Sequence, residues 1–445
     1  MKHVALSLSL LLVWAAVASG QSLARLSLDD AIAIALEHNR SLQNSALAEE
    51  RAAHDVDIAR TRRLPVFGVE AQVSRLLKPI DIMFPEGAFG SFPSTGPVPA
   101  TDTSVTTPAR ATVLLDASVS QPLTQLIQAG LNVRLSEASL ELERERTRAS
   151  RLSLVNSVKR SYYAILQTSS ALTAAETNVQ LLEELNRVVG NRVTQQVALK
   201  ADGFDVQTRL AQVQLTSLTL RHSLASAKEQ LNQLLGRDVR TDFDVAGALD
   251  PTRAELDLET ARSRAIANRP DVRQANLRVR QAELSRRVAR AEYIPDVSLA
   301  LQSISPMNID GAPRNISSVG IQMKWEPFDW GRRSAAVASR GLEVRQAHNA
   351  LSDTEDHAIV EINGQFRKLE EARARLRVAA LSQRTAEENA RVRGEQYRVQ
   401  AALLADVLQA QATYAETNNQ YQQALLSLLT ASADFEQSLG EDVTK

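Results

Sequence analysis

Two long segments of the chain carry apolar residues at the same heptad spacing. In the first segment, steps of four and three residues alternate along Val206, Leu210, Val213, Ser217, Leu220, Leu224, Ala227, Leu231 and Leu234. The spacing recurs 201 residues later, from Val407 to Phe435. A period of about 3.5 residues is typical of a left-handed coiled-coil seam. One such stripe would indicate ordinary helix packing, but two in the same register indicate a tandem repeat of a long helical hairpin.

Proline is absent from both segments, between residues 123 and 250 and from residue 328 to the end of the chain. Proline removes a backbone donor and clashes with the preceding turn, so its absence permits very long helices. We predict a turn between Ala198 and Gly203. The long helices are predicted at 124–197 and 331–398, and the return helices at 204–236 and 403–439.

Alternation of apolar and polar residues predicts two strands in each half of the chain. They lie at 66–76, 110–121, 296–304 and 317–326. A helix is predicted before each pair, at 26–63 and at 256–293. A loop rich in Pro, Gly, Ser and Thr, 78–108, separates the first two strands, and a linker, 237–255, joins the halves. The chain is therefore predicted to contain two structural repeats, 21–250 and 256–445.

Each predicted strand has the length of a tilted strand that crosses a bilayer, with one apolar and one polar face. We predict that the polar side chains line a water-filled lumen. They are Glu70, Gln72, Asp116, Ser118, Asp296, Gln322 and Lys324. Aromatic residues at the strand ends resemble the interface girdle of an outer-membrane barrel. They are Phe67, Trp325, Phe328 and Trp330. The alternative is a soluble β-sandwich, whose strands also alternate.

Four strands per chain are too few to close a membrane barrel, which needs at least about eight. An open edge in lipid would leave backbone groups without hydrogen bonds. We therefore expect several chains to share one barrel that continues into a barrel of antiparallel coiled-coil helices. The predicted fold class is an α+β membrane protein.

The N-terminus has the pattern of a signal peptide. Lys2 and His3 precede an apolar run, 4–17, and small residues follow up to Gly20. The run is too short to span a bilayer, so we predict cleavage of residues 1–20 rather than a buried N-terminal helix.

Composition excludes several other functions. The net charge of −1 gives no indication of a nucleic-acid partner. The absence of cysteine removes disulfides and thiolate chemistry. The six histidines form no His-x-x-x-His pair, and no phosphate-binding glycine loop is present. We therefore expect neither an enzyme nor a cofactor or metal site.

The chain resembles the TolC-like outer-membrane efflux proteins over essentially its whole mature length. The resemblance rests on the duplicated order of elements and on local motifs: Leu28-Asp29-Asp30-Ala31, Asn268-Arg269-Pro270-Asp271-Val272, Glu326-Pro327-Phe328-Asp329-Trp330-Gly331 and Asp406-Val407-Leu408-Gln409-Ala410. Each motif is weak alone, and their order and duplication make the resemblance specific.

The resemblance implies a homotrimer with a twelve-stranded barrel in the outer membrane of a Gram-negative bacterium. It also implies a large periplasmic helical tunnel that docks to an adaptor (membrane fusion) protein and an inner-membrane pump. Such a channel serves as the passive exit duct of a tripartite efflux or type I secretion system. The substrate and the pump are not given by the sequence. The alternative function is that of a periplasmic coiled-coil adaptor or scaffold.

Family gating residues lie at the periplasmic tip. By position, the resemblance implies Asp205 and Asp406 as paired tip acids, with Tyr397 and Gly203 nearby. The family's glycine six residues before each acid is replaced by Leu199 and Gln400. For each aspartate, the alternative role is that of a helix cap or a solvated acid.

Overall fold

The computed structural model describes residues 25–75, 77–107, 111–246, 257–308, 313–399 and 401–441, so the predicted signal peptide lies outside the described residues. The chain divides into two compact units. The helical unit comprises Met1–Gln43, Ser150–Ala265 and Val360–Lys445, and the sheet unit comprises Asn44–Ala149 and Ile266–Ile359. Each unit takes segments from both predicted repeats, so the repeats are not separate compact bodies.

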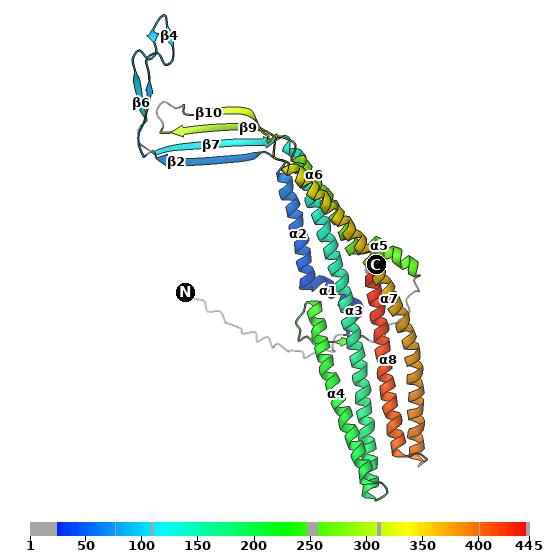
Figure 1. Cartoon of the computed structure of the whole chain (residues 1–445). Coiled ribbons are helices and arrows are strands. Elements are labelled where there is room, and N and C mark those ends of the chain that lie inside the picture. Colours follow the sequence, from blue (N-terminus) through cyan, green and yellow to red (C-terminus); the bar gives the residue numbers. More distant parts are fainter. Residues whose placement is uncertain are drawn as a thin grey trace, which may run out of the picture. The chain divides into compact units, whose positions relative to one another are not determined.

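The sheet unit is built around four antiparallel strands in the order β10-β9-β7-β2 (Figure 1). Their bounds are β2 (Val66–Arg75), β7 (Ala111–Pro122), β9 (Asp296–Met307) and β10 (Ile316–Lys324). These strands lie where alternation predicted them, although β9 extends three residues further. Helices α2 (Arg40–Thr61) and α6 (Pro270–Ala291) lead into β2 and β9.

The segment predicted as the loop 78–108 contains additional strands, which corrects that prediction. Strand β3 (Ile80–Phe84) pairs with β6 (Thr103–Thr107), and β4 (Ser91–Phe92) pairs with β5 (Gly96–Pro97). The many Pro and Gly residues concealed the short alternation of Ile80, Ile82 and Phe84. Four strands per chain is therefore correct only for the main sheet.

The helical unit contains two hairpins (Figure 1). Helix α3 (Gln125–Thr194) enters it from the sheet unit and turns back into α4 (Lys200–Leu235). Helix α7 (Arg332–Arg398) likewise turns back into α8 (Leu404–Leu439). Gly236 and Gly440 follow the return helices in the left-handed conformation, the common helix stop.

The predicted helix 26–63 is interrupted at Asn39, between α1 (Leu28–His38) and α2. The backbone of Asn39 is extended, its side chain donates to the Leu234 carbonyl oxygen at 2.8 Å, and it accepts from the Leu42 N–H at 3.0 Å. The side chain thus caps α2 while it binds the end of α4, so tertiary contact and capping together break the helix.

The predicted helix 256–293 is interrupted at the corresponding place. Helix α5 (Leu258–Asn268) ends before Arg269, and Pro270 begins α6. Proline disfavours the helical conformation of the residue before it and suits the first helical position, which explains this break from local chemistry.

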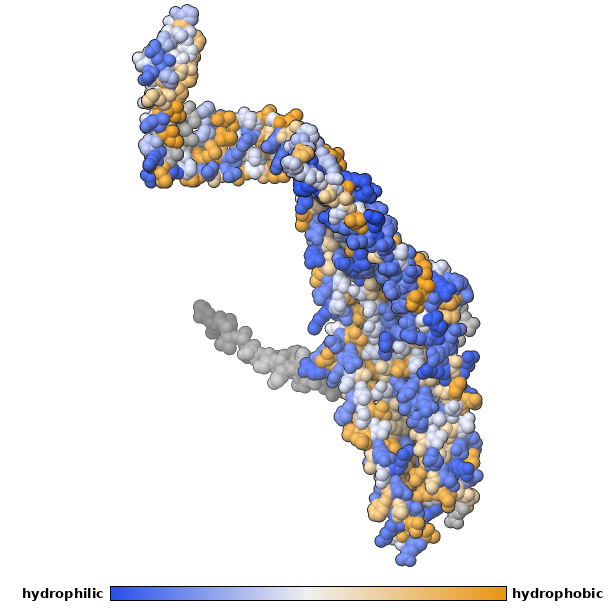
Figure 2. Space-filling view, viewed as in Figure 1, coloured by the Kyte–Doolittle hydropathy of each residue, from blue (hydrophilic) through white to orange (hydrophobic). Residues whose placement is uncertain are grey.

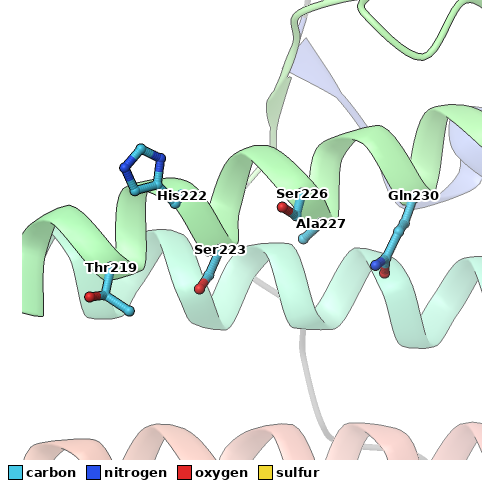
Figure 3. A pocket seen from close by; sticks show the side chains of 6 residues that line it. All are labelled: Thr219, His222, Ser223, Ser226, Ala227 and Gln230. Atoms are coloured by element: carbon cyan, nitrogen blue, oxygen red, sulfur yellow. The ribbon is translucent and has the colours of Figure 1, made fainter.

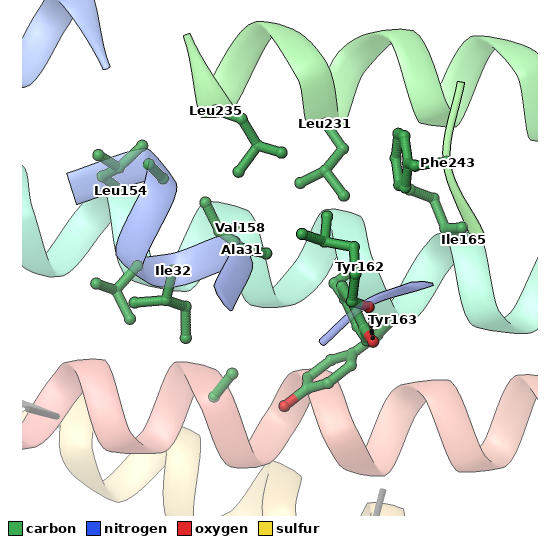
Figure 4. Close-up of a cluster of buried hydrophobic side chains, with 14 residues drawn as sticks. Ala31, Ile32, Leu154, Val158, Tyr162, Tyr163, Ile165, Leu231, Leu235 and Phe243 are labelled. Atoms are coloured by element: carbon green, nitrogen blue, oxygen red, sulfur yellow. Dashed lines mark hydrogen bonds between the residues drawn. The ribbon is translucent and has the colours of Figure 1, made fainter. Parts of the chain in front are cut away.

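A core in the helical unit fixes α1 against the α3–α4 hairpin (Figure 4). Leu231 and Leu235 from α4 and Val158 from α3 are fully buried there. The Tyr162 hydroxyl lies 2.9 Å from the Leu26 carbonyl oxygen and 3.0 Å from that of Ala246, and burial raises its pKa.

Tyr162 thereby joins α3 to a short parallel pair of strands, β1 (Arg25–Leu26) and β8 (Asp244–Val245). Strand β8 lies within the segment predicted as the linker 237–255.

Candidate functional site

The strand register places all seven predicted lumen residues on one face of the main sheet. Directly opposed residues of an antiparallel pair share a face. The pairs on this face include Gly68–Ser118, Glu70–Asp116, Gln72–Leu114, Ser118–Gln302, Ser298–Gln322 and Asp296–Lys324. The register also places Ser298 and Gln302 on this polar face, in agreement with the alternation along their own strand.

The opposite face of the sheet is apolar and uncovered. Its side chains are largely exposed: Val69 at 78%, Val319 at 70% and Ile321 at 72%. Hydrophobic residues are also visible along the strands in Figure 2. An antiparallel sheet in a water-soluble domain buries its apolar face. Here the apolar face is exposed along β2 and β10, as the polar face is, which is the pattern of strands whose apolar face contacts lipid.

The polar face carries an excess of negative charge. Glu70 lies directly opposite Asp116, and the Gln302 amide donates to an Asp116 oxygen at 2.7 Å. Asp296 lies directly opposite Lys324 in the strand register. Opposed like charges destabilise a strand pair unless water or counterions screen them. The polar face therefore suits contact with water, and its negative charge attracts cations.

The segment that follows β10 carries three of the four predicted girdle residues, Trp325, Phe328 and Trp330. Phe328 is 67% exposed and Trp330 is 89% exposed, and their rings meet edge to face at 4.8 Å. Trp330 has a positive φ of 57°, a strained conformation for a bulky residue.

A buried arginine holds this segment in place. Arg333 donates to the Glu326 carbonyl oxygen at 2.8 Å, and its guanidinium lies 3.3 Å from the Asp329 carboxylate. Asp329 also accepts from the backbone N–H of Arg333 and that of Gly331, and these bonds hold its pKa below the ordinary value. The contacts fix the strained backbone that presents the two rings. The other girdle residues, Phe67 and Trp325, are also exposed.

The two hairpin turns have the same capping geometry, and this geometry corrects the predicted pairing of acids. The Asp202 carboxylate accepts from the Leu199 N–H at 3.2 Å, and Asp406 accepts from the Leu403 N–H at 3.2 Å. Asp202 is therefore the counterpart of Asp406, and Asp205 lies one turn further along α4. The two return helices are offset by 204 residues, because the same offset separates Leu199 from Leu403 and Gly236 from Gly440.

The corrected register changes which residue stands at the family's glycine position. Six residues before Asp202 is Gln196, which has a positive φ of 63°. The next N–H, of Val197, donates to the Arg192 carbonyl oxygen at 2.9 Å, as in a Schellman helix end. Gln196 thus adopts the left-handed conformation that glycine favours.

The remaining predicted tip residues occupy different positions. Gly203 lies inside α4, because the turn comes earlier than predicted and the helix already begins at Lys200. Tyr397 is half-buried near the end of α7, and the Arg192 guanidinium lies 4.8 Å from its ring centre. This cation–π contact joins the ends of the two hairpins, and Arg192 was not predicted from the sequence.

Among the described residues, helix α4 carries a surface groove (Figure 3). The residues that line it do not form a catalytic arrangement. The groove is lined by Thr219, His222, Ser223, Ser226, Ala227 and Gln230, so a histidine and serines lie near one another. None of these residues is a carboxylate that could orient the histidine, as a nucleophilic triad requires. Within the described part of the chain, no three His, Asp or Glu side chains are placed to hold a metal ion.

No helix among the described residues has the length and apolar character needed to cross a membrane.

Two curated proteins are similar to parts of the chain. An uncharacterized protein of Haemophilus influenzae is 22% identical over 305 residues, which is 66% of this chain and 62% of that protein. Protein CyaE of Bordetella pertussis is 29% identical over 195 residues, 42% of this chain and 40% of that protein. The matches span less than two thirds of either relative.

Among solved structures, the CmeC outer membrane channel of Campylobacter jejuni is similar in fold. Its TM-score is 0.77 at 16% identity, with 93% of this chain and 85% of that chain covered. The sequence profile of the outer membrane efflux protein family matches residues 31–237 and 261–441, most of both repeats. The family and this solved neighbour are transport proteins rather than enzymes. The chain belongs to the outer membrane efflux protein family.

Proposed function

We propose that the protein is the outer-membrane channel of a tripartite export system and forms a homotrimer. The observation that carries this proposal is the main sheet, which has an exposed apolar face, a polar face and two edge strands, β2 and β10. Pairing of β2 with β10 of the next copy would satisfy the edge groups that lipid leaves unbonded. Three copies would close a twelve-stranded barrel around the polar faces.

In this barrel, Phe328 and Trp330 stand with Phe67 and Trp325 at the membrane–water interface, where aromatic rings are favoured. The helical unit extends into the periplasm as a tunnel. The duct itself is passive, since an inner-membrane pump supplies the energy, and an adaptor protein docks to the hairpin ends. Efflux of small molecules and type I secretion of proteins both fit such a duct. Residues 1–20 would act as the signal peptide that directs the chain to export.

The proposal is tested by membrane fractionation. Expressed in a Gram-negative host, the chain should appear in the outer membrane as a trimer band that heating converts to monomer. The alternative, a periplasmic adaptor or scaffold, predicts a chain that is extracted without detergent and shows no heat-modifiable band. A stable aqueous monomer would contradict the channel proposal.

At the tip, we infer that three Asp406 carboxylates form an acidic constriction, with three Asp202 side chains on the neighbouring turns. Asp205, Gly203 and Tyr397 belong to the same region, with Tyr397 tied to Arg192. Rings of carboxylates favour cations in a pore. The hydrogen bond to Leu403 shows that Asp406 is also a helix cap, so a useful variant must separate charge from capping.

Asp406→Asn removes the charge and keeps a side-chain oxygen that can accept the Leu403 N–H. We expect the cation-to-anion permeability ratio of single channels in planar bilayers to fall severalfold, with little change in thermal stability. Asp353→Asn, which removes an exposed acid on α7 outside the hairpin turn, is the matched control. An unchanged ratio in Asp406→Asn would remove Asp406 from the gate.

A further inference from the structure

The connection between β2 and β7 forms an ordered hairpin beyond the end of the main sheet. Strands β3 and β6 pair over five residues each. At its far end, the Gly87 N–H donates to the Pro99 carbonyl oxygen at 3.0 Å, and the Val98 N–H donates to that of Gly90 at 2.9 Å. The Phe84 and Phe89 rings pack at 5.1 Å. The other connection at this end of the sheet spans only residues 308–315.

One face of this hairpin is apolar and open. The register places Ile80, Ile82, Phe84 and Val105 on the same face, together with Thr103 and Thr107, and Asp81, Met83, Ser104 and Thr106 on the other. Ile80, Ile82 and Val105 are each about half exposed, at 50%, 47% and 51%. Asp81, the one charged residue of β3 and β6, lies on the opposite face, so the apolar face has no charged group of these strands to hold water.

A two-stranded hairpin is only marginally stable by itself in water, and a covered apolar face is what makes such a ribbon persist. The hairpin grows out of β2, which is an edge strand of the main sheet. In the proposed trimer that edge meets β10 of the next copy, so each hairpin is rooted at a boundary between copies. A shared barrel would also hold three hairpins at one mouth, where tethering makes their association effectively intramolecular.

We propose that the three hairpins of one trimer pack against each other through the face formed by Ile80, Ile82, Phe84 and Val105, and so narrow the outer mouth of the channel. The occupant of this apolar face is therefore a second copy of the same hairpin. This inference rests on the proposed function, because it needs the trimer. It adds a restriction at the end of the duct opposite the helical tip.

Cysteine cross-linking tests the packing directly, because the chain has no cysteine of its own. In detergent-purified trimers, Ile82→Cys should form a disulfide between two copies on mild oxidation, with the third copy left single. The matched control is Asp81→Cys, one residue away on the opposite face of the same strand. We expect cross-linking at position 82 to exceed that at position 81 severalfold on a non-reducing gel.

A second measurement concerns the pore. Replacing residues 79–106 by a short Gly-Ser connection should raise single-channel conductance severalfold, since the restriction at the mouth is lost. A spin label at position 82 should be shielded both from a water-soluble relaxation agent and from oxygen dissolved in lipid.

Several outcomes would overturn the hairpin proposal alone. An intact heat-modifiable trimer that cross-links equally at positions 81 and 82, or at neither, shows that the apolar faces do not meet. High access of lipid-dissolved oxygen at position 82 would place the hairpin against the bilayer instead. Absence of the trimer from the unsubstituted protein would reject the channel itself, and the hairpin packing with it.

Discussion

Ile321→Arg should remove the trimer from the outer membrane, whereas Gln322→Arg should leave it in place. The two residues are neighbours in β10, but their partners Leu299 and Ser298 place them on opposite faces of the sheet. Ile321 is 72% exposed on the apolar face. An arginine in the middle of a lipid-facing strand costs about 2–4 kcal/mol, and the threefold assembly imposes that cost three times. On the polar face, the same arginine meets water.

The measurement is the yield of heat-modifiable trimer in outer-membrane fractions, normalised to total expression. Both variants introduce the same side chain at adjacent positions in place of an uncharged residue, so the change in net charge is matched. Equal loss of trimer in the two variants would mean that the strand simply tolerates no arginine. Normal assembly of Ile321→Arg would contradict the assignment of the apolar face to lipid.

Gly236→Ala should destabilise the helical unit strongly. Gly236 ends α4 with a φ of +72°, and a β-carbon there would lie 2.2 Å from the His38 carbonyl oxygen, at the end of α1. The left-handed conformation costs a residue with a side chain about 1–2 kcal/mol, and overpacking against fixed backbone adds roughly 1–3 kcal/mol. We therefore expect a loss of about 2–5 kcal/mol in the free energy of unfolding.

Thermal and denaturant unfolding followed by the helical circular dichroism signal would measure this loss. Gly190→Ala is the matched control, because Gly190 lies within α3 and a β-carbon there meets nothing within 4 Å. Alanine is the better helix former by about 1 kcal/mol, so this control should be neutral or stabilising. A Gly236→Ala protein as stable as the control would show that the end of α1 does not pack against the stop of α4.

The long elements could be predicted because their patterns are local. The alternation of Val69, Ala71 and Val73 specifies a strand with two different faces wherever it is placed, and the proline-free segments specify helices. The same local chemistry gave Glu70 and Asp116 as polar-face residues before their pairing was known. Asp406 was likewise found from its motif, and its capping bond agrees with the alternative role considered for it.

The register between the repeats was predicted incorrectly, for a physical reason. Shifting a heptad seam by three residues exchanges its two apolar positions, so offsets of 201 and 204 fit the pattern almost equally. The helix ends break this ambiguity, because Leu199 pairs with Asp202 as Leu403 pairs with Asp406. Alignment of the two heptad seams therefore paired Asp205 with Asp406. The capping hydrogen bonds instead identify Asp202 as the counterpart of Asp406.

The periodic features follow from the residue pattern alone: heptad helices, two-faced strands and the duplication of both. The spacing of apolar residues within one element determines which of its faces is apolar, so this feature depends on nearby residues alone. The way in which the elements meet depends on the folded chain, because these contacts join residues far apart in the sequence. Asn39 breaks a helix by binding Leu234, the strand register gathers the polar residues on one face, and Arg192 reaches Tyr397. No local pattern encodes such partners.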